Sequence, residues 1–416
     1  MAPSTAYHEL AVAPVERASE RWQRDTMLAG MLPVIGIAGT GGKTTVVRML
    51  DAILSKAGMR TATWTDLGVE IRGRRQKGEL SGWSLALSRL ADGAIDVAIQ
   101  ELHWSTIHAV GLPAMSYPVL ALTNLTGGQA DGWNPITLRN ATNAATRVAD
   151  AAHPAGTLVI NGDDYSLVDA ATATKAATIV IARSKESPSL SRQLKAGGAA
   201  VWNGFDGIVM SPGRGAPLIP LVDPDDVPAT MHGSATFQIN NAMTAAAIAS
   251  AIGVDASDIQ AGLRSFRTDP ELMPGSFNHW ENASLRTVVS QLASSWQTRL
   301  VLRSINPGAR RRQITVVGDL GTIEMSDIVE TGRVLGRYPG AILLYENTDQ
   351  QRLDAFRHGI TANEYPPLIV HLPTERKAIN RALRTVREDD VLLMLPSGDP
   401  SVACRAITRF MDQANK

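Results

Sequence analysis

The residues best suited to chemistry are a lysine and two threonines that follow a glycine-rich turn. An apolar run at 33–38 precedes this turn, and helical apolar spacing follows it. Glycines allow several backbone N–H groups to point at one anion, and a helix start adds partial positive charge. A lysine there can reach nucleotide phosphates, and a threonine hydroxyl can bind Mg²⁺. The predicted phosphate-binding residues are Gly39, Thr40, Gly41, Gly42, Lys43, Thr44 and Thr45.

Polar residues also stand at the ends of two later apolar runs. Glu101 ends the run 95–100, and Asn124 follows the run 118–123. In open α/β sheets, ligands bind beyond the carboxyl ends of the strands, so both residues are predicted beside the phosphate loop. A carboxylate there suits Mg²⁺, which makes Thr44 and Glu101 the predicted metal ligands. Asn124 is expected either to touch phosphate or to hydrogen-bond its own backbone.

Other charged and polar residues carry weaker signals. His103 and His108 are five positions apart, which does not suit one helical face, so no histidine metal site is predicted. His103 is expected to be a turn residue, with a polar role beside Glu101 as the alternative. The basic residues of 72–77 are expected in a solvated loop, with an anion site as the alternative.

The phosphate loop, G-T-x-G-K-T-T, resembles that of the Mur ligases, folylpolyglutamate synthetases and cyanophycin synthetases. The resemblance is greatest to the ligase module of the cyanophycin synthetases and covers about residues 33–400. It implies ATP-dependent amide ligation through an acyl phosphate, with Mg²⁺ and an amino-acid or peptide substrate. It also implies that Lys43 and Glu101 are catalytic and that Asn241 and Asp319 belong to the nucleotide site. The other similar stretches are 65–73, 95–102, 161–164, 241–246, 274–278, 318–319, 345–347 and 375–379.

Several family residues are replaced in this chain. Residues 127–132 contain no histidine, and no lysine occurs between Asn124 and Lys175, where many relatives carbamylate a lysine to hold a second Mg²⁺. The remaining ligands suffice for one octahedral Mg²⁺, so we expect one cation and no carbamylated lysine. The alternative function is a catalytically weakened homologue that binds nucleotide and acts as a partner or regulatory subunit. The other replacements are Ala145 or Thr146 near the lysine position, Phe237-Gln238, Ser276 and 291–296.

The apolar pattern predicts an α/β fold. Strand-like and helix-like runs alternate from residue 33, which favours a parallel sheet covered on both faces. We predict an N-terminal extension at 1–32, a phosphate-loop central domain at 33–270 and a smaller Rossmann-like domain at 271–416. Strands are expected at 33–38, 61–65, 95–100, 118–123, 157–161, 178–182, 285–289, 313–317, 341–345, 367–371 and 391–395, with more within 199–222. Helices are expected at 15–28, 44–57, 83–92, 135–152, 165–174, 240–252, 256–266, 290–302, 324–336, 349–357, 374–387 and 400–412.

Composition excludes several classes of protein. The 416 residues include 40 basic and 40 acidic ones, and this balance argues against nucleic-acid binding. The single cysteine, Cys404, excludes a disulfide framework. No apolar run approaches the roughly 20 residues of a membrane span, and no signal peptide is recognised, so a cytoplasmic protein is expected. The expected partners are small-molecule substrates, and a homodimer or a partner subunit is compatible with the sequence.

Overall fold

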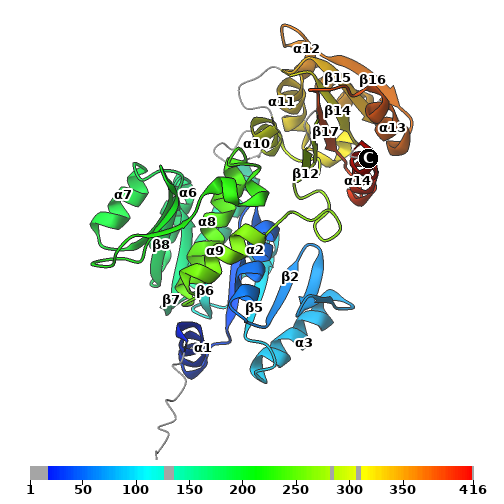
Figure 1. The fold of residues 1–416 in the computed structure, drawn as a ribbon. Helices are drawn as coiled ribbons and strands as arrows, with labels where there is room; N and C mark the ends of the chain where they lie inside the picture. The colour runs from blue at the N-terminus through cyan, green and yellow to red at the C-terminus, as the bar shows by residue number, and fades with distance from the viewer. Residues whose placement is uncertain (1–16, 126–134, 282–284, 306–310, 415–416) are drawn as a thin grey trace, which may run out of the picture.

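The computed structural model describes residues 17–125, 135–281, 285–305 and 311–414, which form two sheets with their helices (Figure 1). The strands of the first sheet are β1 (Val34–Ala38), β2 (Thr61–Thr65), β3 (Gly68–Ile71), β4 (Arg74–Arg75), β5 (Val97–Leu102), β6 (Tyr117–Leu122), β7 (Ala152–Asn161), β8 (Ala177–Ala182), β9 (Ala199–Gly204), β10 (Gly207–Ser211) and β11 (Ile219–Val222). Their order is β11-β10-β9-β8-β7-β6-β1-β5-β2-β3-β4. The strands β2 and β5 to β9 run parallel to β1, and antiparallel hairpins complete both edges.

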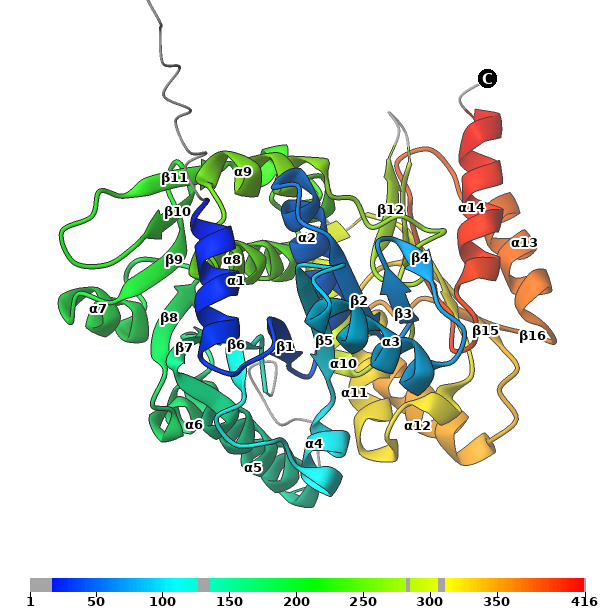
Figure 2. The same cartoon turned by 90° about the horizontal axis from the view of Figure 1, so that it is seen from below.

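Helices cover both faces of the first sheet because its central strands are apolar on both sides. In β6, Val119 and Ala121 face the core under α2, α8 and α9, whereas Leu120 and Leu122 face the core under α5 and α6. Figure 2 shows these two helix layers on opposite sides of the strands. The helices are α1 (Ala18–Leu28), α2 (Lys43–Lys56), α3 (Glu79–Ala91), α4 (Trp104–Val110), α5 (Pro135–Ala151), α6 (Tyr165–Ala170), α7 (Pro188–Lys195), α8 (Thr236–Ala251) and α9 (Ala256–Ser265).

The second sheet is smaller and has the same layered construction. Its strands are β12 (Asn278–Glu281), β13 (Arg286–Val289), β14 (Gln313–Val317), β15 (Gly340–Tyr345), β16 (Leu368–Leu372) and β17 (Val391–Leu395), in the order β12-β13-β17-β14-β15-β16. Only β12 is antiparallel to its neighbour among these strands. One face packs on α10 (Ser295–Ile305), α11 (Met325–Leu335) and α12 (Gln350–Thr361), and the other on α13 (Glu375–Thr385) and α14 (Ser401–Ala414).

The predicted α/β class is confirmed, and the local differences have identifiable causes. The helix expected at 290–302 begins only at Ser295, because Ser290 and Leu292 donate backbone hydrogen bonds to Met394 and Pro396 at the end of β17. Within the stretch expected as a basic loop, Arg74–Arg75 form β4, which pairs with β3. The run expected to stop at residue 100 continues to Leu102, so Glu101 lies inside β5.

The segment between the two sheets is held by one buried asparagine. Asn278 is 0% exposed, and its Nδ2 donates to the carbonyl oxygens of Thr268 at 2.9 Å and Met273 at 3.0 Å. Its Oδ1 accepts hydrogen bonds from Gly275 N–H at 2.7 Å and from the Cys404 thiol at 3.3 Å. The division of the chain into separate domains at residue 270 stays a prediction. Within the described ranges, every helix is too short or too polar to cross a bilayer.

Candidate functional site

The phosphate loop connects β1 to α2 at the carboxyl edge of the first sheet. Because β1 lies between β5 and β6 and is parallel to both, the residues after these three strands meet at one edge. Gly42 precedes α2 with a φ of 83°, a left-handed conformation that glycine adopts without steric cost. A Cβ atom at Gly42 would overlap the side chain of Asn241 from α8. Gly42 and Asn241, two predicted site residues that are distant in sequence, therefore lie against each other.

Residues that follow β6 hold the loop in shape. Asn124 Oδ1 accepts a hydrogen bond from Gly41 N–H at 2.9 Å, and its Nδ2 donates to Gly41 O at 3.0 Å. The Thr123 hydroxyl donates to the same carbonyl at 2.9 Å. Thr40 is held as well, because its N–H donates to Asn124 O at 2.9 Å and its hydroxyl accepts from the Trp104 indole at 3.2 Å. Asn124 thus supports the loop backbone, and its contact with a nucleotide stays a prediction.

Lys43, Thr44 and Glu101 form a charged group at the start of α2. The Thr44 hydroxyl donates to Glu101 Oε2 at 2.9 Å, and Lys43 Nζ lies 3.5 Å from Glu101 Oε1. The side chains of Lys43 and Glu101 are only 11% and 2% exposed, so water screens their attraction less than at the surface. Pairing of Ile37 in β1 with Glu101 in β5 sets this proximity. The hydroxyl and carboxylate oxygens are hard donors that fit Mg²⁺.

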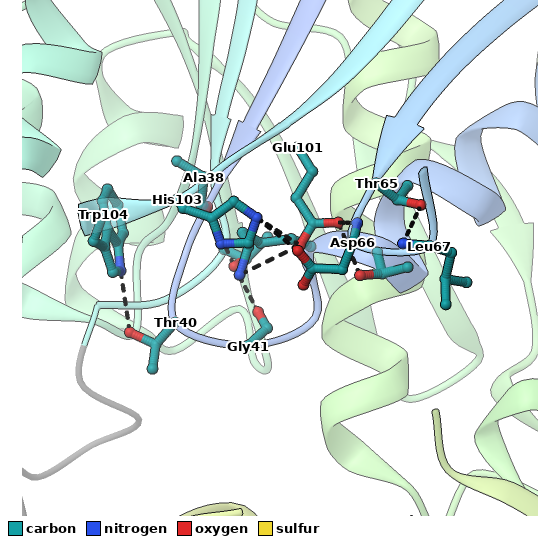
Figure 3. Close-up of polar contacts among 12 residues, drawn as sticks. Ala38, Thr40, Gly41, Thr65, Asp66, Leu67, Glu101, His103 and Trp104 are labelled. Carbon is teal, nitrogen blue, oxygen red and sulfur yellow. Dashed lines mark hydrogen bonds and ion pairs between the residues drawn. The ribbon is translucent and has the colours of Figure 1, made fainter. Parts of the chain in front are cut away.

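Asp66 and His103 complete this group, although neither was predicted as a metal ligand. His103 Nε2 lies 2.9 Å from Asp66 Oδ1 and 3.8 Å from Glu101 Oε1, and Asp66 N–H donates to Glu101 Oε2 at 3.3 Å (Figure 3). The hydrogen bond with His103 is the largest cause of the lowered pKa of Asp66. The only sequence signal that could have indicated these two ligands is their position at strand ends, since Asp66 follows β2 and His103 follows β5. That β2 pairs with β5 is decided by the sheet.

A cavity of about 690 Å³ lies between the phosphate loop and the second sheet. Its size is typical of sites for small molecules. Asn241 stands in its wall, where its Nδ2 donates to Gln238 Oε1 at 2.9 Å. The described residues that line the cavity do not include Lys43 or Glu101. Those that line it include Gly41, Gly42, Thr44, Thr45, Asn124, Gln238 and Asn241 from the first sheet and its helices, and Ser276, Gln291, Trp296 and Gln297 from the other side.

Asp319 is also predicted to belong to the nucleotide site, but like Gly39, Thr40 and Lys43 it is not among the residues that line the cavity within the described ranges. It precedes a short 3₁₀ turn, Leu320–Thr322, and its Oδ1 accepts from Gly321 N–H at 3.0 Å. Its own N–H donates to the Ser397 hydroxyl at 2.9 Å. These contacts order the turn after β14, and a nucleotide contact by Asp319 stays a prediction.

Comparison with known proteins supports the resemblance stated above. The family model for the Mur ligase middle domain matches residues 37–249. Cyanophycin synthetase of Nostoc sp. is 26% identical over an alignment of 377 residues, which covers 88% of this chain and 41% of that protein. A UDP-N-acetylmuramoylalanine–D-glutamate ligase of Streptomyces avermitilis is 30% identical over 58% of this chain and 46% of that protein. This chain therefore spans less than half the length of these relatives.

Solved structures share the fold over nearly the whole chain. The bifunctional folylpolyglutamate synthase/dihydrofolate synthase of Yersinia pestis, complexed with AMPPNP and a Mn ion, superposes with a TM-score of 0.64 at 17% identity, covering 96% of both chains. MurF of Acinetobacter baumannii superposes with a TM-score of 0.60 at 17% identity, covering 95% of this chain and 79% of MurF. Both the predicted fold and the predicted family resemblance are confirmed.

Proposed function

Because this chain belongs to the family of the Mur ligase middle domain, we propose that it is an ATP-dependent ligase that joins a carboxylate to an amine. The observation that carries the proposal is the partly buried group of Lys43, Thr44 and Glu101 at the phosphate loop. A substrate carboxylate would take the γ-phosphoryl group of ATP, forming an acyl phosphate and ADP. An amine would then attack the acyl carbon, so that the C–N bond forms, the bond to phosphate breaks and the amine loses a proton.

Each residue of the group has a distinct role in this proposal. Lys43 would place its ammonium against the β- and γ-phosphates and stabilise the charge of the transferred group. Thr44 and Glu101 present the oxygen donors that would hold Mg²⁺, whose chemistry is to neutralise phosphate charge when it is bound. The loop backbone, fixed by Asn124 through Gly41, would orient the phosphates without further rearrangement. Asn241, in the cavity wall, would face the adenine base.

The second sheet supplies the other wall of the proposed nucleotide cavity. Gln297 lies so near the loop that a Cβ on Gly41 would be 3.2 Å from its Nε2. An amino-acid or peptide amine would reach the acyl phosphate from this side, where Ser276 and Gln291 also line the cavity. Closure of the two sheets over the nucleotide would exclude water from the reactive intermediate.

A nucleotide-binding partner or regulatory subunit is the second candidate function. The observation in its favour is the replacement of the expected lysine by Ala145 or Thr146 on α5, where Ala145 is fully buried and offers no ligand. Both candidates require nucleotide binding, so binding alone does not separate them. Phosphate release that depends on an added amino acid or peptide does.

The test compares Lys43→Ala with wild type by calorimetry with ATP and Mg²⁺, and then measures phosphate release across amino acids and peptides. We expect Lys43→Ala to abolish binding, because it removes the cation delivered to the phosphates. Lys56→Ala is the matched control, since Lys56 is the exposed last residue of the same helix. Equal affinity of Lys43→Ala and wild type would refute the nucleotide site. Wild-type binding without stimulated phosphate release would favour the partner subunit.

A further inference from the structure

We propose that Asp66, Glu101 and His103 bind a divalent cation in addition to the one assigned to Thr44 and Glu101. The inference rests on the proposed function, since the cation would act beside the nucleotide phosphates. One carboxylate oxygen from each acid and one ring nitrogen of His103 lie within 4.8 Å of one another. This site would revise the expectation of a single cation, which considered only Thr44 and Glu101 as ligands.

The two oxygens of Glu101 differ in how well the protein satisfies them. Oε2 accepts hydrogen bonds from the Thr44 hydroxyl at 2.9 Å and from Asp66 N–H at 3.3 Å. Oε1 faces Lys43 Nζ at 3.5 Å and His103 Nε2 at 3.8 Å, which are long separations for charge-assisted hydrogen bonds. The side chain is 2% exposed, so water does not replace those contacts freely. Oε1 is therefore the oxygen of Glu101 that can turn to a cation with the smaller loss of existing hydrogen bonds.

The charge of the group also changes when a nucleotide binds. Lys43 lies beside Glu101 in the structure, but the proposed function directs its ammonium to the β- and γ-phosphates. Asp66 and Glu101 would then face each other without the Lys43 ammonium beside them, and the phosphates would add further negative charge. A divalent cation between the carboxylates offsets this repulsion.

The spacing of the three ligands suits adjacent positions of an octahedral cation. A metal–ligand distance of about 2.1 Å separates neighbouring ligands by about 3 Å. His103 Nε2 is 2.9 Å from Asp66 Oδ1 and 3.8 Å from Glu101 Oε1, and the three ligand atoms lie within 4.8 Å of one another, so rotation of the side chains would bring them onto one ion. The Asp66 side chain is 62% exposed, which leaves room for water ligands. Glu101 would supply oxygen donors to both cations.

The experiment counts Mn²⁺ ions bound in the presence of AMPPCP, a non-hydrolysable ATP analogue without a bridging nitrogen. Pulsed electron paramagnetic resonance of the same samples reports whether a histidine nitrogen is coupled to Mn²⁺. We expect a second equivalent of Mn²⁺ and a nitrogen coupling in wild type. His103→Gln should lose both, and Asp66→Asn should lose the second equivalent. His108→Gln, which changes the other histidine of this segment, should retain both signals.

The outcomes separate this proposal from the proposed function. If AMPPCP binds but only one Mn²⁺ is held and no nitrogen is coupled, the second cation site is wrong and the ligase proposal stands. If His103→Gln keeps the coupling, His103 is not a ligand and the site is also wrong. If wild type binds no AMPPCP, the proposed function itself fails. Thermal unfolding of each variant is expected to match that of wild type, because the side chains of Asp66 and His103 are partly exposed. A matching unfolding temperature excludes misfolding as the cause of a lost Mn²⁺ equivalent or a lost nitrogen coupling.

Discussion

Substitution of Asn278 is expected to have a large effect on stability. Asn278 lies fully buried between the two sheets and binds three backbone groups of the connecting segment, those of Thr268, Met273 and Gly275. The Asn278→Ala variant would leave all three groups without their partner in a region that water does not reach. The Cys404 thiol, also buried, would lose its contact with Oδ1.

The expected loss follows from the number of backbone groups left unpaired. Each buried N–H or C=O that loses its partner costs about 1–3 kcal/mol, and partial relaxation of the segment reduces the sum. We therefore expect Asn278→Ala to lower the free energy of unfolding by about 3–5 kcal/mol. For a unit of about 150–250 residues, each kcal/mol lowers Tm by roughly 2–4 °C, which predicts a decrease of roughly 6–20 °C.

Differential scanning calorimetry measures this decrease directly. Cys404→Ala is the matched control, because it removes only the sulfur contact and a small volume, at about 1 kcal/mol. A Tm decrease for Asn278→Ala no larger than that for Cys404→Ala would show that the backbone groups find other partners. The reasoning about the connecting segment would then be wrong.

Two further variants test the phosphate loop and the sheet beside it. Gly42→Ala should lower Tm, because an alanine at φ 83° costs about 1–2 kcal/mol and its Cβ would overlap Asn241. Gly41→Ala is the control in the same thermal scan, because its Cβ would lie 3.2 Å from the flexible end of Gln297 and 3.8 Å from the Trp296 ring. Glu70→Gln should destabilise the protein near neutral pH by about 1–3 kcal/mol, because it removes the carboxylate charge and one of the two oxygens that accept 2.7 Å hydrogen bonds from Arg48. These bonds lower the pKa of Glu70 below its ordinary value, so the stabilisation is fully present above that ordinary pKa and is lost as the pH falls through the lower pKa of the folded state. The difference in unfolding free energy between the variant and wild type should therefore be smaller at about pH 3 than at about pH 7. An equal difference at both values would refute the assignment.

The sequence by itself determined the local features of this protein. Glycine, lysine and threonine after an apolar run predicted the phosphate loop, because neighbouring residues alone decide whether a backbone can curl around an anion. Apolar periodicity, which is also a local property, predicted most strands of both sheets, but not β3, β4 or β12. It failed at 290–294, where a helix-like pattern is overridden by backbone hydrogen bonds to the end of β17.

The tertiary structure decided which strand ends lie side by side. The order β6-β1-β5-β2 differs from the order along the chain, so Asp66 after β2 meets Glu101 and His103 more than thirty residues later. It also decided that Asn124 holds Gly41 and that Asp319 stays outside the cavity lining. Such contacts depend on strand pairing between distant segments, which is set by burial over the whole sheet. No local pattern of residues contains that information.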